Sequence, residues 1–154
     1  MKITGQVRVK APRAAVYEAL RDARFFASCV DGVHDLTELA PDRYSAVLET
    51  KVAYMSFKFK VTVELTRAQP PSEIEAKVEG TPLGIVGRLT ATALTTLSEA
   101  GDETVIDYTV DSNLTGKLGS LGQPVLKSKA KEMERQFASR IQAKFQAANT
   151  GSET

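Results

Sequence analysis

Residues 118–148 read LGSLGQPVLKSKAKEMERQFASRIQAKFQAA, with apolar side chains three or four positions apart. This spacing places one apolar stripe along an α-helix, because 3.6 residues make a turn. The stripe consists of Leu118, Leu121, Val125, Leu126, Met133, Phe137, Ile141 and Phe145. A helix of this length extends roughly 45 Å, enough to cross a whole sheet. The stretch therefore predicts one uninterrupted helix from near Leu118 to near Ala148, with its stripe buried against the rest of the protein.

The chain begins with a pattern typical of a strand followed by two short helices. Apolar residues and glycine alternate with polar residues at Ile3, Gly5, Val7 and Val9. That period of two is typical of a strand with one buried face. Proline suits the first turn of a helix, so Pro12 and the apolar spacing after it predict a helix over residues 12–20. A second short helix, from Asp22 as N-cap to Cys29, is expected to follow.

Six further alternating segments fill the middle of the chain. They cover residues 35–39, 44–52, 57–65, 73–79, 89–97 and 106–112, and turn residues separate them. Successive strands joined by short turns favour an antiparallel meander. Only the terminal helix is long enough to cover the apolar face of such a sheet. We therefore expect an α+β fold of about seven strands, with two short helices after the first strand.

Composition indicates one ordinary globular domain. The chain has 154 residues, 42% of them hydrophobic, which is enough to fill a single core. We expect this domain to span residues 1–148 and residues 149–154 to form a disordered polar tail. With 20 basic and 19 acidic residues, the chain has no net field that would attract nucleic acid. No apolar run approaches the ~18 residues of a membrane span, and the single cysteine suits a reducing compartment, so we expect a cytoplasmic protein.

Three stretches carry a family resemblance that covers nearly the whole chain. They are MKITG at residues 1–5, APR at residues 11–13 and TGKLGSLG at residues 115–122. With the order of elements, they resemble the helix-grip fold of the START and polyketide-cyclase (SRPBCC) superfamily, and within it the G-subunit family of carbon monoxide dehydrogenase. The resemblance implies a curved sheet that wraps the last helix and encloses an apolar pocket. Residues 29–33 read CVDGV, where the family often has two cysteines, so no paired-cysteine role is expected.

The resemblance also implies a biological role. Members of this family are accessory to molybdenum hydroxylases of the carbon monoxide dehydrogenase type, in maturation, membrane recruitment or electron-transfer coupling. The implied partners are such an enzyme complex and a hydrophobic small molecule, either a respiratory quinone or a lipid. Contact with a membrane is expected to be at most peripheral, at its inner face and through a partner.

Small side chains on the inward strand faces favour a pocket between sheet and helix. Alanine, glycine and serine alternate there with larger residues, and small residues leave volume unless the helix packs closer, which is the alternative. Hydroxyl groups of Tyr44, Thr50, Tyr54, Tyr108 and Ser112 are candidates to bind a polar end of the ligand. The predicted lining consists of Tyr44, Ala46, Leu48, Thr50, Phe59, Val61, Ala76, Val78, Leu83, Ile85, Ala91, Ala93, Tyr108, Val110, Leu121, Val125, Met133 and Phe137.

The loop at residues 80–87 has three glycines around the apolar Leu83, Ile85 and Val86, where loops are ordinarily polar. We expect it to gate entry of a lipophilic ligand, with a mobile hairpin loop as the alternative. It lacks the lysine and hydroxyl residue of a phosphate-binding P-loop.

Catalytic and cofactor chemistry receives little support from the residues. Cys29 and His34 are too few for a structural zinc site, which takes four ligands, so no metal and no cofactor are expected. Strand alternation directs Asp107 and Asp111 to solvent, and no inward acid or base is evident. A polyketide-cyclase-like enzyme is therefore the weaker alternative to a binding protein.

The terminal helix also carries a basic cluster. It consists of Lys127, Lys129, Lys131 and Arg135, and Lys127, Lys131 and Arg135 are the candidate partner-binding residues. The cluster either forms a solvated face or docks an acidic partner or an anionic membrane surface. This leaves a second class of function open, an assembly module whose pocket is vestigial. The adjacent Phe25 and Phe26 are expected to divide between the core and the surface.

Overall fold

The computed structural model describes the backbone of residues 1–152 and the side chains of residues 1–147. Its strands are β1 (Lys2–Val9), β2 (Val33–Ala40), β3 (Arg43–Val52), β4 (Met55–Gln69), β5 (Glu73–Pro82), β6 (Gly87–Ala100) and β7 (Glu103–Gly116). Its helices are α1 (Arg13–Arg21), α2 (Ala23–Ser28), the short 3₁₀ helix η1 (Gly119–Leu121) and α3 (Gln123–Ser152).

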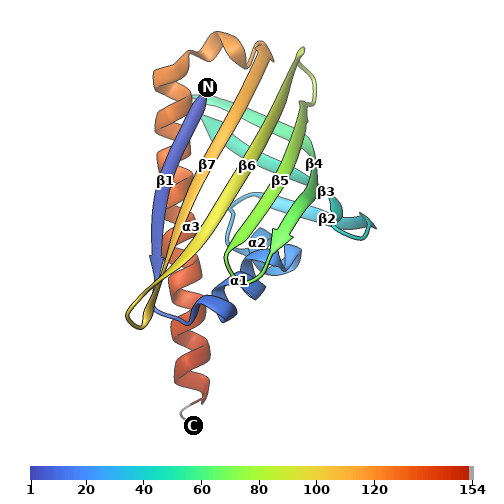
Figure 1. Ribbon diagram of the computed structural model, residues 1–154. Coiled ribbons are helices and arrows are strands. Elements are labelled where there is room, and N and C mark those ends of the chain that lie inside the picture. The colour runs from blue at the N-terminus through green and yellow to red at the C-terminus, as the bar shows by residue number, and fades with distance from the viewer. Residues whose placement is uncertain (153–154) are drawn as a thin grey trace.

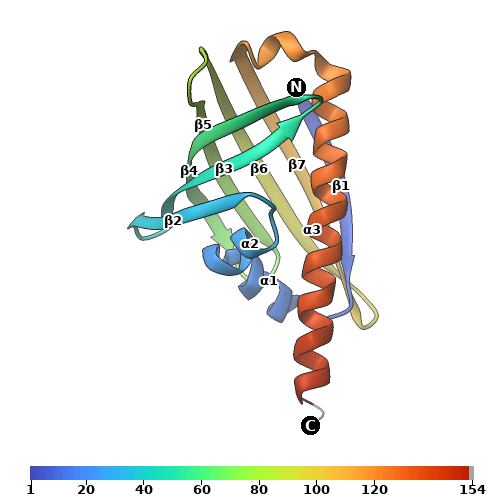
Figure 2. The same cartoon turned by 180° about the vertical axis from the view of Figure 1, so that it is seen from behind.

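The seven strands form one antiparallel sheet in the order β1-β7-β6-β5-β4-β3-β2. The sheet curves strongly, so that β2 and β3 cross in front of the long central strands when seen from behind (Figure 2). The helix α3 lies on the concave side, with α1 and α2 at the lower end (Figure 1). This arrangement confirms the predicted α+β helix-grip fold.

Local sequence explains how the first two helices begin. Pro12 is the N-cap of α1 and has extended backbone angles. Asp22 caps α2, because its side chain accepts hydrogen bonds from the backbone N–H groups of Arg24 and Phe25, at 3.0 and 3.2 Å. Both caps agree with the predicted positions of these helices.

The prediction of one uninterrupted terminal helix was wrong at its first turn. Residues 119–121 form η1, and α3 begins only after Gly122, which has φ of 88° and ψ of 149°. These angles are accessible essentially to glycine alone and break the helical path. At the other end, the backbone of α3 continues past the predicted limit to Ser152. Residues 153–154 of the predicted tail lie outside the described residues.

Two separate cores pack at opposite ends of the fold. The lower core lies between β1, α1, the lower ends of β5–β7 and the second half of α3, and consists of Val7, Val9, Ala11, Val16, Tyr17, Cys29, Ile74, Leu97, Ile106 and Ile141. The upper core consists of Val52, Phe57, Phe59 and Leu118, with Leu48, Met55, Val61, Ile85, Leu89, Leu114, Leu121 and Val125 packed around them. The middle of the sheet belongs mostly to neither core.

Candidate ligand-binding site

The concave middle of the sheet is built from two rows of inward-facing residues, here called the middle rows. Strand pairing aligns Leu65, Ala76, Ala93, Val110 and Ile3 in one row. It aligns Tyr44, Val63, Val78, Ala91 and Ser112 in the other. Because side chains alternate along a strand, both rows face the side on which α3 lies.

The middle rows remain partly accessible to solvent although they face α3. Of their ten residues only Ser112 is buried, and the other nine have intermediate exposure. Inward positions of a closely packed domain are ordinarily buried. Alanine occupies three of the ten positions, and its small side chain fills little space there. The middle rows therefore lack the tight cover that the two cores have.

The path of α3 explains why this cover is missing. The helix contacts the sheet mainly along β1 and to a smaller extent at β3, and its contacts with the central strands are sparse. Its first turns pack on the upper core through Val125, and its later turns on the lower core through Phe137 and Ile141. Between these anchored ends, Met133 and Glu134 are partly exposed.

A polar pair joins the sheet to this middle part of α3. The hydroxyl of Tyr108 on β7 donates a hydrogen bond to Glu134 Oε1, at 2.6 Å. The Glu134 side chain is 16% exposed, and its other oxygen lies 3.5 Å from Lys131 Nζ. Burial, followed by the hydrogen bond to Glu134 and the charge of that carboxylate, raises the pKa of Tyr108. This pair is named the Tyr108–Glu134 dyad below.

Gly5 on β1 makes room for the dyad. It pairs with Tyr108 across the sheet, and a Cβ atom at position 5 would clash with both the Tyr108 hydroxyl and Glu134 Oε1. The absence of a side chain at this position therefore lets the hydroxyl and the carboxylate meet beside β1.

Glu134 is not among the residues that the sequence predicts to line the site. The expectation that no acid points inward was wrong. The signal was present in the spacing, because Glu134 precedes Phe137 by three residues and Ile141 by seven, which places it on the buried stripe of α3. A charge on an apolar stripe needs a partner, and only the tertiary structure supplies Tyr108.

The predicted lining residues fall into four groups. Tyr44, Ala76, Val78, Ala91, Ala93 and Val110 lie together in the middle rows, with Ala46, Thr50, Tyr108 and Met133 also partly exposed. Six others pack in or against the upper core, namely Leu48, Phe59, Val61, Ile85, Leu121 and Val125. Phe137 packs against the lower core. Leu83 is 52% exposed, so it does not line the interior in this conformation.

Three of the predicted hydroxyl groups cannot donate to a ligand inside, and one of them is Tyr108, which already donates to Glu134. Tyr54 lies in the turn between β3 and β4 and is 92% exposed, because the strand ends at Val52 and the chain reverses there. Ser112 donates its hydroxyl hydrogen to the carbonyl of Met1, at 3.1 Å. Tyr44 is partly buried, and its pKa is raised by that burial and by the nearby Glu38 and Asp42 carboxylates.

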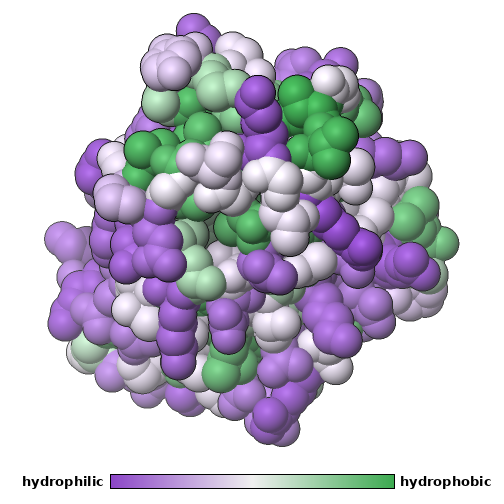
Figure 3. Space-filling view, turned by 90° about the horizontal axis from the view of Figure 1, so that it is seen from above, coloured by the Kyte–Doolittle hydropathy of each residue, from purple (hydrophilic) through white to green (hydrophobic). Residues whose placement is uncertain are grey.

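The upper end of the molecule carries exposed apolar side chains. The β5–β6 loop, residues 83–86, exposes Leu83 and Val86 but packs Ile85 against the upper core. Backbone hydrogen bonds tie it to its neighbours, from Leu83 N–H to the carbonyl of Lys58 and from Lys117 N–H to the carbonyl of Val86. Seen from above, this end shows several apolar groups separated by polar side chains (Figure 3).

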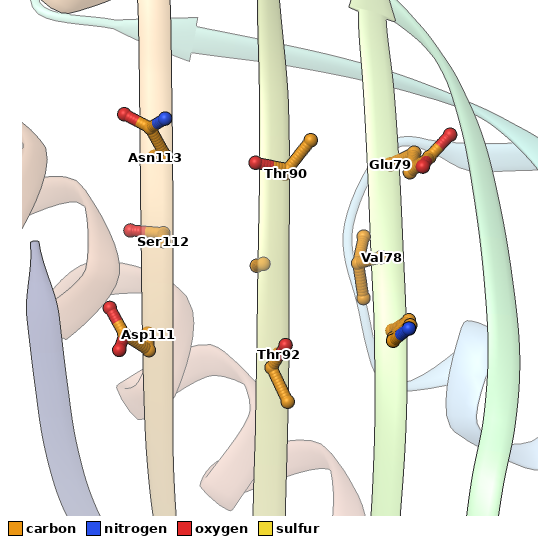
Figure 4. Close-up of a pocket in the computed structure, with 9 residues that line it drawn as sticks. Val78, Glu79, Thr90, Thr92, Asp111, Ser112 and Asn113 are labelled. Carbon is orange, nitrogen blue, oxygen red and sulfur yellow. The ribbon is translucent and has the colours of Figure 1, made fainter.

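A hollow of about 300 Å³ lies on the opposite face of β5, β6 and β7. Its side chains are at the outward positions of the strands, among them Glu79, Thr90, Thr92, Asp111 and Asn113 (Figure 4). Val78 and Ala91 of the predicted lining border it only as part of the sheet that forms its floor. A second hollow of about 440 Å³ lies near Arg13 and Glu99 at the lower end. Neither hollow is the predicted space between sheet and helix, and the first is too polar for a lipophilic ligand.

The remaining residues singled out from the sequence have ordinary surroundings. Cys29 is buried in the lower core, and that burial raises the pKa of its thiol. His34 is 41% exposed and lies near the carboxylates of Asp35 and Glu49. Within the described part of the chain, no group of three or more potential ligands gathers to hold a metal ion.

The surface expectations agree with the structure. Phe25 packs against the lower core, whereas Phe26 is 45% exposed and its ring centroid lies 5.2 Å from that of Phe137. Asp107 and Asp111 are exposed on the outward face. The basic residues Lys127, Lys131 and Arg135 of α3 are also exposed.

Comparison with protein families decides where this chain belongs. The model of the CoxG family, which comprises the G subunits of carbon monoxide dehydrogenase, matches residues 5–146. The chain is a member of the CoxG family. A comparison with curated proteins finds no match.

Solved structures similar to this CoxG-family chain share its fold. A conserved protein from Geobacillus kaustophilus has 24% identity and a TM-score of 0.88, over 96% of this chain and 97% of the other. A START superfamily protein from Mycobacterium smegmatis has 14% identity and a TM-score of 0.70, over 96% and 98%. Protein Ms6760 from the same organism has 19% identity and a TM-score of 0.67, over 96% and 92%. The START-like architecture is thus common to all three.

Two of the stretches that resemble the CoxG family contain residues that the fold requires. The opening stretch contains Gly5, which accommodates the dyad. The stretch before α3 contains the buried Leu118 and the helix-breaking Gly122. In the part of this CoxG-family chain that the structure describes, no helix combines the length and hydrophobicity needed to cross a membrane.

Proposed function

We propose that this protein is a non-enzymatic carrier that binds a lipophilic molecule between the middle rows and α3. The observation that carries the proposal is the partial exposure of inward-facing residues between two closed cores. Alanine side chains at the centre of this region and apolar side chains around it suit a ligand that is mostly hydrocarbon. Membership of the CoxG family and the START-like fold support a ligand-binding accessory protein.

The ligand class we propose is a respiratory quinone or a membrane lipid. Transfer of apolar surface from water contributes about 25 cal/mol per Å², so a tail that buries on the order of 200 Å² contributes roughly 5 kcal/mol. That gain supports binding without a metal or a covalent bond. The redox enzyme in this proposal is a carbon monoxide dehydrogenase of the molybdenum type, to which the carrier delivers the molecule or from which it collects it.

The entrance we propose is the upper end, beside the β5–β6 loop. Ile85 packs against the upper core there, and backbone hydrogen bonds hold its loop at Leu83 and Val86. Displacement of Ile85 would open the upper core toward the middle rows. The exposed Leu83 and Val86 give this end an apolar rim that a lipophilic molecule can cross.

The test is recovery of a bound molecule from protein purified without detergent. Native mass spectrometry is expected to show a mass above that of the chain, and extraction with organic solvent is expected to release a quinone or lipid. Protein stripped of this molecule is then expected to bind added decylubiquinone. Protein that carries nothing and fails to bind either decylubiquinone or a fatty acid would show that the proposal is wrong.

A second candidate function is an assembly module that acts through its outer surface. The observation in its favour is the exposure of Lys127, Lys131 and Arg135 along one side of α3, available to an acidic partner. This module would need docking but no ligand. A variant that fills the middle rows separates the two functions and is described in the Discussion.

A further inference from the structure

The Tyr108–Glu134 dyad has an unusual hydrogen-bonding character for a site that receives a lipophilic ligand. A tyrosine hydroxyl has one hydrogen to donate, and Tyr108 donates it to Glu134 at 2.6 Å. An ionised carboxylate has no hydrogen to donate at all. Toward a third molecule, the dyad therefore offers lone pairs and no donor.

The surroundings of the dyad direct these lone pairs to the interior. Glu134 is only 16% exposed, and Lys131 lies on the exposed side, 3.5 Å from Oε2. Oε1, which accepts from Tyr108, lies beside Gly5 on β1. Tyr108 is next to Val110 of the middle rows on the inward face of β7. A ligand in the middle rows therefore meets Tyr108 and Glu134 at the β1 side of the site.

Two other inward hydroxyl groups lie near the dyad, and neither carries a charge. Ser112 already donates its hydrogen to the Met1 carbonyl. Thr95, the partner of Tyr108 on β6, is an inward hydroxyl beside the dyad and can either donate or accept. Among the side chains that the structure describes, Glu134 is the charged acceptor turned inward at this point.

We infer that the dyad selects ligands by hydrogen-bond polarity, binding lipophilic molecules that carry an O–H donor in preference to those with only a carbonyl or ether oxygen. The inference rests on the proposed carrier function. For a molecule that exists in two redox states, the site favours the reduced, hydroxyl-bearing form, since its O–H can donate to the dyad. A hydrogen bond to a charged group is among the stronger ones, so the preference is expected to be about tenfold in Kd.

The test uses two probes with the same tail, 4-nonylphenol and 4-nonylanisole, which differ in that the first has an O–H donor and the second a methyl ether. Wild-type protein is expected to bind the phenol about tenfold tighter, although the anisole is the more hydrophobic probe. Upon binding, the near-ultraviolet absorption of the phenol is expected to shift to longer wavelength as it donates to the dyad. This spectroscopic measurement needs no variant.

Two charge-neutralising variants assign the preference to the dyad. Glu134→Gln replaces the carboxylate with an amide that can itself donate, so the phenol preference is expected to fall at least fivefold. Glu132→Gln is the matched control on the same helix, because Glu132 is half-exposed and pairs with Lys129. The control is expected to keep the wild-type preference. Thermal unfolding of each variant verifies that it is folded.

The outcomes separate this inference from the carrier function. Equal affinity of wild-type protein for both probes, or a bound phenol without a spectral shift, overturns the inference and leaves the carrier function in place. A phenol preference that survives in folded Glu134→Gln overturns the assignment to the dyad. Failure of both probes to bind overturns the inference and the carrier function together.

Discussion

At the scale of single residues, Tyr108 depends on strands and a helix that are distant in sequence. Its hydroxyl reaches Glu134 only because Gly5 has no side chain. A charge on the inward side of α3 thereby acquires a partner, and its cost of burial is offset by a short hydrogen bond. Burial of the hydroxyl, together with this contact, raises the pKa of Tyr108, so the folded protein holds the proton more tightly than the unfolded chain does.

This difference predicts a loss of stability in alkaline solution. The pKa of Tyr108 is raised above its ordinary value of 10.0, so the folded state binds the proton more tightly. The stability that this proton contributes is fully present below pH 10 and is lost as the pH rises from 10 toward the higher folded-state pKa. The free energy of unfolding is expected to fall by up to about 1 kcal/mol more between pH 9 and pH 11 in wild-type protein than in Tyr108→Phe.

Urea unfolding at both pH values measures this difference. Tyr17 and Tyr44 also have raised pKa values, so the variant is expected to retain part of the alkaline loss. Identical pH dependence in wild-type protein and Tyr108→Phe would contradict the role given to the dyad.

At the scale of elements, Gly122 separates η1 from α3 and thereby sets the direction of the long helix. Its backbone angles, φ of 88° and ψ of 149°, are strained for any residue with a side chain. Gly122→Ala is therefore expected to lower the free energy of unfolding by about 1–3 kcal/mol. Chemical denaturation measures this loss.

Gly101→Ala is the matched control for this prediction. Gly101 also has a positive φ, 65°, in the β6–β7 turn, and a Cβ atom there would meet nothing within 4 Å. Its left-handed conformation costs an L-residue only about 1 kcal/mol. A loss in Gly122→Ala no larger than in the control would indicate that the helix start adjusts without strain.

The β5–β6 loop gives a second prediction at this scale. Gly84 has φ of 84°, which proline cannot adopt, and the space around it is open. Gly84→Pro is therefore expected to redirect the loop, to lower the free energy of unfolding by about 1 kcal/mol, and to change the association and dissociation rates of 4-nonylphenol at least threefold. Stopped-flow fluorescence measures the rates. Gly101→Pro, in a turn at the opposite end, is expected to leave them unchanged, and unchanged rates in both variants would exclude the loop as a gate.

At the scale of the whole molecule, the two closed cores hold the ends of the fold and leave the middle rows without close cover. Ala93→Phe fills this region and is expected to abolish ligand binding while leaving docking to a dehydrogenase intact. Overpacking costs about 1–3 kcal/mol, so circular dichroism must verify that the variant is folded. Isothermal titration with decylubiquinone and a pull-down with the enzyme measure the two activities separately.

Leu94→Phe is the matched control, because Leu94 is the next residue of β6 and is 36% exposed on the outward face. It is expected to preserve both activities. Retention of ligand binding in Ala93→Phe would place the ligand elsewhere than the middle rows. Loss of docking alone, in either variant, would instead favour the assembly module.

Sequence by itself determined the elements and the fold of this protein. Alternation in the strands and the stripe of α3 are local periodic signals that report which face of an element is buried. The caps at Pro12 and Asp22 are local signals for where a helix begins. The family resemblance depended on three short stretches of sequence and on the order of the elements. Even the inward position of Glu134 was present in the helical spacing.

Only the tertiary structure decided which side chains of the sheet and of α3 contact one another. The periodicity of a single element does not specify how closely α3 approaches the sheet. That distance depends on side chains from several strands and on the break at Gly122. Gly5 lies more than a hundred positions before Tyr108, and Tyr108 lies 26 positions before Glu134, so local periodicity cannot relate the three residues. The dyad therefore forms only when β1 has paired with β7 and α3 has packed beside β1.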